Sequence, residues 1–305
     1  MLHNNKELFE QLILKTSEYL GVKAEIVEKD YYVTLFLKNL VSIMPDIIFK
    51  GGTSLSKCYH IINRFSEDID LNIQSDKKPS ESKRKQMKSS IIQVINALNF
   101  NLTNEDKVFS RRDYNRYIID YNSSLSADYL KEQLIVETVI YQRAYPTVKK
   151  QVDSLIYQFL SQNGYNDFIN EYNLQPFEIN VQSAERTLID KIFALADYYM
   201  LKTTSEHSRH IYDIYKLSEI VTIDESLKDL ALSVAQERKP HKMSVSVQDG
   251  VDITEIIHEI ISNAPYEEDY ENITIPLLFE DVSYKQAISA LENILNKGLF
   301  DKVKK

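Results

Sequence analysis

Cysteine and glycine are both scarce in this sequence, and long apolar runs are absent from it. Cys58 is the only cysteine among 305 residues, which excludes an internal disulfide and a zinc cluster built from cysteines. No uninterrupted apolar run approaches the length that spans a bilayer, and the N-terminal segment lacks the basic start and apolar core of a signal peptide. These absences predict a cytoplasmic protein that does not enter a membrane.

The net charge of -9 gives the chain no overall attraction to nucleic acid, so such a partner would need a local basic patch. One basic segment has Lys77, Lys78, Lys83, Arg84, Lys85 and Lys88. Its favoured interpretation is the solvated face of a helix that opens near Ser80 or Ser82, with a nucleic-acid strip as the alternative. A smaller cluster at residues 237–242 is weaker still.

The periodicity of apolar residues changes along the chain. Helices are predicted over residues 1–20 and 22–41, and strands over residues 46–50, 117–122, 134–141 and 177–181. From Ser183 onward the apolar spacing is helical almost throughout. The sequence therefore predicts an α/β half at residues 1–182 and a helical half at residues 183–305.

Two aspartates lie one residue apart in the segment SEDIDLNI. Asp68 and Asp70 alternate with Ile69 and Leu71, so a strand would bury the isoleucine and leucine and point both acids the same way. Two adjacent carboxylates repel each other unless a cation lies between them, and Mg²⁺ suits such oxygen ligands. The alternative is an ordinary acidic strand face, because Asp-x-Asp is a common tripeptide.

Two of the six glycines stand side by side just upstream, in the segment IIFKGGTSLSKCY. This segment predicts a strand, a tight turn and a helix. Gly51 and Gly52 would let a ligand approach the backbone, while Thr53 and Ser54 would cap a helix whose free amides favour a phosphate. No glycine directly precedes Lys57, so this is not a P-loop. Together, a phosphate-binding turn and a metal-binding acid pair are what nucleotide transfer requires.

These residues resemble motif I of the nucleotidyltransferase superfamily and, more narrowly, the AbiEii toxin family of type IV toxin–antitoxin and phage-defence systems. The resemblance extends to three further segments, VEKDYYVTLFL at residues 27–37, SAERTLIDKIFAL at residues 183–195 and RHIYDIYKL at residues 209–217. It implies a nucleotidyltransferase-like α/β (α+β) fold. A mixed sheet flanked by helices would form the core, and a mostly helical C-terminal lobe would complete the active-site cleft.

The resemblance also implies roles for individual residues. Asp68, Asp70, Lys191 and Asp213 would be catalytic, and Gly51, Gly52, Thr53, Ser54, Lys191 and Arg209 would bind the nucleotide. Asp68 and Asp70 would hold the metal, which is expected to be Mg²⁺ with Mn²⁺ as an alternative. Glu137 is the preferred third carboxylate because it lies mid-strand among apolar residues, and Asp120 is its rival. Lys29 and Asp30 interrupt an apolar helix and are expected to support it as an ion pair.

Expected partners are a nucleoside triphosphate, an RNA acceptor with the tRNA 3′ end as first candidate, and a cognate antitoxin. Modification of the RNA would stop translation. Two other functions remain open from the sequence: transfer to a small-molecule acceptor, and an inactive nucleotidyltransferase fold that serves as an interaction module. The family often has an arginine just before its Asp-rich segment, where this chain has His210, so Arg209 is the nearest match.

Overall fold

The computed structural model describes residues 1–66, 68–75, 79–125 and 132–303. It divides into two compact units. The core unit comprises Met1–Tyr59 with Ser66–Val181, and the helical unit comprises His60–Phe65 with Gln182–Lys305. No helix in the described ranges is both long enough and apolar enough to cross a membrane.

The core unit is built on a seven-stranded sheet in the order β3-β4-β5-β2-β1-β7-β6. Its strands are β1 (Ile47–Lys50), β2 (Asp68–Ile73), β3 (Asn101–Leu102), β4 (Tyr114–Asp120), β5 (Gln133–Val139), β6 (Thr147–Val152) and β7 (Phe177–Gln182). The sheet is mixed, because β2 runs antiparallel to β1 but parallel to β5, and β1 runs parallel to β7. This confirms the expected mixed sheet.

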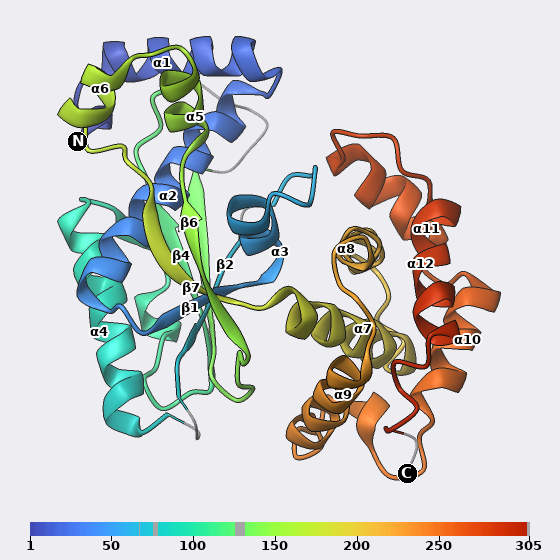
Figure 1. Cartoon of the computed structure of the whole chain (residues 1–305). Coiled ribbons are helices and arrows are strands. Elements are labelled where there is room, and N and C mark those ends of the chain that lie inside the picture. Colours follow the sequence, from blue (N-terminus) through green and yellow to red (C-terminus); the bar gives the residue numbers. More distant parts are fainter. Residues whose placement is uncertain (67, 76–78, 126–131, 304–305) are drawn as a thin grey trace. The chain divides into compact units, whose positions relative to one another are not determined.

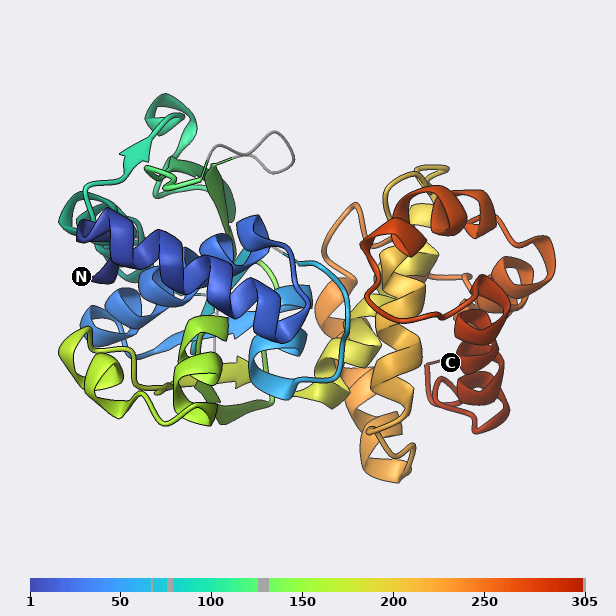
Figure 2. The same ribbon diagram turned by 90° about the horizontal axis from the view of Figure 1, so that it is seen from above.

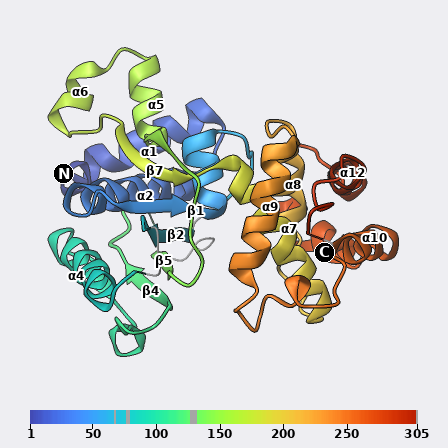
Figure 3. The ribbon, with the colours of Figure 1, turned by 60° about the horizontal axis from the view of Figure 1, so that its bottom comes forward.

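Helices cover the sheet of the core unit. They are α1 (Lys6–Leu20), α2 (Ala24–Ile43), α3 (Gly51–Ser54), α4 (Glu81–Ala97), α5 (Leu155–Gln162) and α6 (Asn166–Glu171). Figure 1 shows α2 crossing the sheet, with α1, α5 and α6 gathered at one end. In Figure 3, α4 lies at the other side of the unit from α5 and α6. The predicted helices over residues 1–20 and 22–41 correspond to α1 and α2, and α1 ends at Gly21 in the left-handed conformation.

The helical unit contains α7 (Ala184–Met200), α8 (Arg209–Ser218), α9 (Glu225–Arg238), α10 (Ile253–Asn263), α11 (Glu267–Asp269) and α12 (Tyr284–Asn296). These helices, yellow to red in Figure 2, pack on one another. The apolar stripe of α7 includes Leu188, Ile192 and Leu195, all fully buried. Because the stripe recurs every three to four residues, α7 can bury one face and still carry charged residues beside it.

Candidate active site

The acid pair lies on β2 as the alternation of its side chains predicts. Ile69 and Leu71 are fully buried, whereas Asp68 and Asp70 are only partly buried. The alternation ends at Asn72, which is buried and donates from Nδ2 to the Gln142 carbonyl at 2.6 Å. The two aspartates therefore share one face of β2. Glu67, the acidic residue just before them, lies outside the described residues.

Gly51 allows the turn after β1 to approach Asp70. Its φ of +76° is the left-handed conformation, which glycine adopts without steric penalty. A Cβ atom at this position would lie 1.9 Å from Asp70 Oδ2, which is far inside van der Waals contact. The scarce glycine is thus placed where any side chain would displace a carboxylate of the acid pair.

A row of charged residues crosses four neighbouring strands at the level of Asp70. Asp70 of β2 is paired with Lys50 of β1 on one side and with Glu137 of β5 on the other. Glu137 is in turn paired with Arg116 of β4. Directly paired residues point to the same face of a sheet, so the two carboxylates are neighbours with a cation on either side. This row places Glu137, the preferred third carboxylate, beside Asp70.

Glu137 also has fixed partners on β4. Tyr114 donates from its hydroxyl to Glu137 Oε1 at 2.9 Å, and Arg116 Nε lies 3.6 Å from the same oxygen. Burial and this hydrogen bond raise the pKa of Tyr114 above its usual value. The rival carboxylate, Asp120, pairs with Gln133. It lies four residues from Arg116 on β4, or about 13 Å along the strand.

A divalent metal fits this face with help from a substrate. Among the described residues, no three or more His, Cys, Asp and Glu side chains gather into a cluster that could hold an ion by themselves. Mg²⁺, however, is commonly held by one or two carboxylates together with substrate phosphates. Asp68 and Asp70 provide those two carboxylates on one strand face. Glu137 as a third ligand stays a prediction.

The turn after β1 differs from the expected capped helix. Helix α3 begins at Gly51 itself, its N-cap is Lys50, and no side chain caps it. Thr53 and Ser54 therefore lie inside the helical turn, and the prediction that they cap a helix was wrong. Both are buried and hydrogen-bonded. Thr53 Oγ1 lies 3.0 Å from the hydroxyl of Ser66, just before the acid pair, and Ser54 donates to the Gly51 carbonyl at 2.8 Å.

The helical unit holds a second charged group, centred on Asp213 of α8. Arg64 donates to both carboxylate oxygens of Asp213, at 2.7 and 2.8 Å. Lys191 of α7 donates to Oδ2 at 2.6 Å. Asp213 is fully buried; burial alone would raise its pKa, but the charges of Arg64 and Lys191 outweigh this and hold the pKa below its usual range. Asp213 thus fixes the Lys191 ammonium in place.

A match between this chain and the sequence profile of a protein family shows the family to which the chain belongs. The profile of the nucleotidyl transferase AbiEii toxin family, which belongs to type IV toxin–antitoxin systems, matches residues 35–296. The chain belongs to the AbiEii toxin family. Membership confirms the expected family and makes the protein a nucleotidyltransferase toxin of the type IV toxin–antitoxin class, a class that implies a nucleoside triphosphate substrate and an antitoxin.

Solved structures confirm the fold of this AbiEii toxin. It is similar to MenT4, a nucleotidyltransferase toxin from Mycobacterium tuberculosis H37Rv, with a TM-score of 0.60. The match covers 93% of this chain and 88% of that chain at 16% sequence identity, so the likeness concerns the fold alone. A comparison with curated proteins gave no significant match.

Two charged residues of this AbiEii toxin were missed by the sequence analysis. Lys57, buried just after α3, donates to Asp30 Oδ1 at 2.5 Å and to the Asp153 carbonyl at 3.1 Å. Asp30 thus bonds to the segment after the glycine turn, whereas the sequence suggested Lys29 as its partner. Arg64 is the other missed residue. The sequence did not show the role of either residue, because the partner of each lies far away in the chain.

Segment 60–65 joins the glycine turn to the acid pair and belongs to the helical unit. Besides the Arg64 contacts, the backbone amide of Asn63 donates to the Tyr212 hydroxyl at 2.8 Å. Further along, the amide of Phe65 donates to the Leu277 carbonyl at 3.0 Å. The residue just before the acid-pair motif is therefore hydrogen-bonded into the helical unit.

His210, where the family often has arginine, lies beside Lys191. Its Nδ1 is 3.4 Å from Lys191 Nζ, and its ring stacks at 5.9 Å from that of Tyr198. Burial and the positive charge of Lys191 lower the pKa of His210 well below its usual value. His210 is therefore neutral at pH 7 and can accept a hydrogen bond from the ammonium. Arg209, the nearest family match, is the first residue of α8 and is partly buried.

The lowered pKa of His210 predicts a loss of stability in weak acid. Below about pH 6.5 the unfolded chain protonates this histidine while the folded chain does not, so stability falls as the pH falls. We expect His210→Asn to reduce this slope by up to about 1.4 kcal/mol per pH unit, the value for one proton. Urea unfolding between pH 5 and pH 7.5 measures it. His258→Asn, which changes an exposed histidine of the same unit, is measured in parallel for comparison.

Proposed function

We propose that this AbiEii toxin transfers a nucleotide from a nucleoside triphosphate to a hydroxyl of an RNA acceptor, with the 3′ end of tRNA as first candidate. The observation that carries the proposal is the placement of Asp68 and Asp70 on one face of β2, with Gly51 in direct contact with Asp70. A backbone turn that lies against one carboxylate of the pair is suited to a triphosphate that shares a divalent metal with both carboxylates.

The proposed reaction is an in-line displacement at the α-phosphorus. The acceptor hydroxyl forms a new O–P bond while the bond to the pyrophosphate oxygen breaks, and the hydroxyl proton leaves to solvent. A bound Mg²⁺ would neutralise charge on the phosphates. Asp68 and Asp70 would hold that metal, with Glu137 as the nearest further carboxylate. The backbone of Gly51 and Gly52 would face the phosphates, supported by the hydroxyls of Thr53 and Ser54 inside the turn.

For the helical unit we propose roles in binding the triphosphate. Lys191 would supply a positive charge that stabilises the leaving pyrophosphate. Asp213 is its positioning residue, because it receives the Lys191 hydrogen bond and is itself held by Arg64. Arg209 would add a second positive charge at the start of α8.

The proposed biological outcome is a block of translation in the cytoplasm. A nucleotide added to the 3′ end of tRNA converts the original terminal hydroxyl into a phosphodiester, so that this hydroxyl can no longer accept an amino acid. The cognate antitoxin would relieve this block. A small-molecule acceptor is the competing possibility, and the acceptor test below separates the two.

A transfer assay with purified protein, Mg²⁺, each labelled nucleoside triphosphate and total tRNA tests the proposal. We expect label on tRNA with the wild type and a loss of at least about a thousandfold with Asp70→Asn, because metal positioning and charge stabilisation are lost together. Glu137→Gln should also lower the rate. Asp120→Asn, which changes a carboxylate of β4 away from Asp70, is the matched control and should keep it.

Several outcomes would contradict this proposal. If Asp70→Asn still transfers label to tRNA, the acid pair is not required for the reaction. Label that moves only to a small hydroxyl compound would replace the RNA acceptor by a small molecule. An Asp120→Asn variant that is inactive beside an active Glu137→Gln variant would make Asp120 the third carboxylate.

A further inference from the structure

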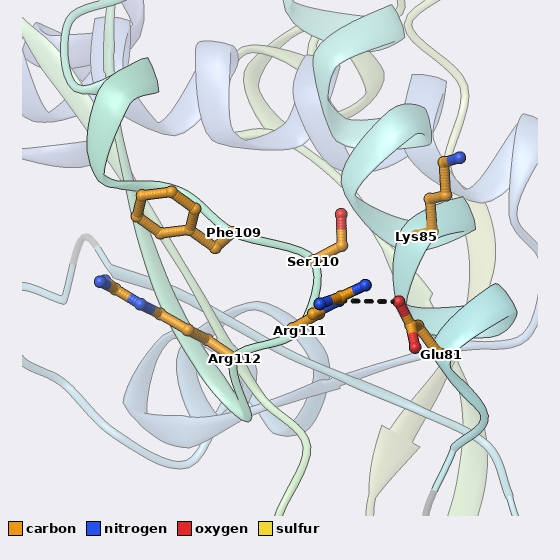
Figure 4. Close-up of a pocket in the computed structure, with 6 residues that line it drawn as sticks. All are labelled: Glu81, Lys85, Phe109, Ser110, Arg111 and Arg112. Carbon is orange, nitrogen blue, oxygen red and sulfur yellow. Dashed lines mark hydrogen bonds and ion pairs between the residues drawn. The ribbon is translucent and has the colours of Figure 1, made fainter.

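A surface loop of the core unit, residues 108–113, presents an aromatic ring and two arginines next to the start of α4 (Figure 4). Together they line an open groove of about 540 Å³, whose lining residues are Glu81, Lys85, Phe109, Ser110, Arg111 and Arg112. Three of these side chains are positive and one is negative, in a chain whose net charge is -9. The groove is therefore a local basic patch of the kind that the overall charge does not reveal.

The loop is held in a fixed shape by its neighbours. The side chain of Asn115 accepts from the Phe109 amide at 2.8 Å and donates to the Phe109 carbonyl at 3.1 Å. From α4, Lys88 donates to the Val108 carbonyl and Arg84 to the Arg111 carbonyl, at 2.7 and 3.1 Å. All four hydrogen bonds are made to backbone groups of the loop, so they do not involve the side chains that line the groove.

Phe109 is 46% exposed. The guanidinium of Arg112 lies 4.4 Å from the ring centroid, and Figure 4 shows the two side chains next to each other. A phenylalanine held at the surface beside arginine offers a flat face on which a nucleic-acid base can stack. An apolar ring of this kind would otherwise be expected in the core.

Arg111 can exchange its present partner for a phosphate. Its ion pair with Glu81 is solvated, since the two side chains are 86% and 60% exposed. Such pairs contribute little to stability, so replacing the carboxylate by a phosphate has a small penalty. Lys85 lies one helical turn from Glu81 on α4 and adds a second cation on the same side of the groove.

We propose that this groove binds a single-stranded segment of the RNA acceptor, with a base stacked on Phe109 and phosphates bound by Arg111, Arg112 and Lys85. The proposal rests on the proposed function and specifies where the acceptor binds. Strand β4 leads from the loop to Arg116, which lies in the charged row with Glu137 and Asp70. From Arg112 to Arg116 the chain covers about 13 Å. A strand bound in the groove can thus place its end near the acid pair.

The groove also shows which side chains of the basic segment at residues 77–88 are placed to bind RNA. Lys77 and Lys78 lie outside the described residues. Of the others, Lys83 contacts Asp46 at 2.6 Å, while Arg84 and Lys88 bind the backbone of the loop. Those three basic side chains therefore serve the fold, and Lys85 is the one that lines the groove. The arginines of the loop are outside the segment that the sequence analysis weighed.

Binding of total tRNA and of a single-stranded oligoribonucleotide tests the proposal without requiring transfer. Fluorescence anisotropy would follow the wild type, Phe109→Ala and the double variant Arg111→Gln/Arg112→Gln over a range of salt concentrations. We expect Phe109→Ala to weaken binding about tenfold, the effect of losing one stacked base. The double variant should flatten the slope of log K against log salt by about 1.4, or about 0.7 for each lost phosphate contact. In the transfer assay, KM for RNA should rise while KM for the nucleotide stays constant.

Matched controls remove similar groups elsewhere. Tyr165→Ala removes a ring with the same 46% exposure, and Lys285→Gln/Lys297→Gln removes two exposed charges outside both basic clusters. Suppose that the groove variants bind RNA as tightly as the wild type and that the wild type transfers label to tRNA. The groove is then not the RNA-binding site, and the proposed function stands. If the wild type binds RNA through the groove but transfers nothing to it, the proposed function is wrong. Loss of antitoxin binding with intact RNA binding would assign the groove to the antitoxin and overturn the proposal.

Discussion

Replacing Gly51 by alanine is expected to lower the rate of nucleotide transfer at least about a hundredfold in an otherwise folded protein. Two effects act together at this position. The residue adopts φ +76°, which strains any residue with a Cβ, and the added Cβ would lie 1.9 Å from Asp70 Oδ2. The carboxylate would have to move or the turn would have to retreat. Since a displacement of about 1 Å can lower a rate a hundredfold, we expect a loss of at least that size.

Gly164→Ala is a control that separates the effect of the clash with Asp70 from the effect of backbone strain. Gly164 has φ +75°, and no heavy atom lies within 4 Å of the position that its Cβ would take. The strain of the left-handed backbone should lower stability by about 1–2 kcal/mol in both variants, and only Gly51→Ala adds the clash with Asp70. Transfer rates and urea unfolding measured on both variants make the comparison. Equal activities for the two variants would show that the contact between Gly51 and Asp70 has no part in transfer.

Local sequence patterns were sufficient to predict the elements that carry the acid pair. The period of two in residues 68–73 correctly places Ile69 and Leu71 in the core, because a strand with one buried face leaves little freedom of register. Helical spacing beyond Ser183 likewise predicts α7, α8 and α12. In both cases the signal lies within one element, so no knowledge of the tertiary fold is needed.

Contacts between distant segments could not be predicted in this way. Arg64 and Asp213 are 149 positions apart, and the sequence around Arg64 has no periodic pattern to mark it. The loop at Phe109 and its anchors on α4 were missed for the same reason. The helix after Gly51 was misjudged locally: Thr53 and Ser54 have good capping side chains, but the glycines let the helical turn begin earlier. The pairing of Asp70 with Glu137 could not be predicted either, because it depends on the order of the strands in the sheet, and the sequence does not show that order.

The second large effect is expected at Asp213, where an asparagine would leave two buried cations without their shared carboxylate. Arg64 and Lys191 are 6% and 7% exposed and both bind Asp213, which is fully buried. Removing one partner of a buried ion pair destabilises a protein by about 3–5 kcal/mol. We expect Asp213→Asn to lower the free energy of unfolding of the helical unit by this amount. Hydrogen exchange should show the loss in α7, α8 and segment 60–65.

The exposed pair Lys239–Asp249 provides the control within the same unit. These side chains are 47% and 90% exposed at a distance of 2.5 Å, so Asp249→Asn should leave stability unchanged within error. A second variant tests the cause of the effect. Adding Arg64→Met to Asp213→Asn removes one of the two stranded cations, and stability should then partly recover. If the double variant is no more stable than Asp213→Asn alone, repulsion between buried cations is not the reason for the loss. Asp213 would then act through packing, and its role in positioning Lys191 would have to be judged from transfer rates alone.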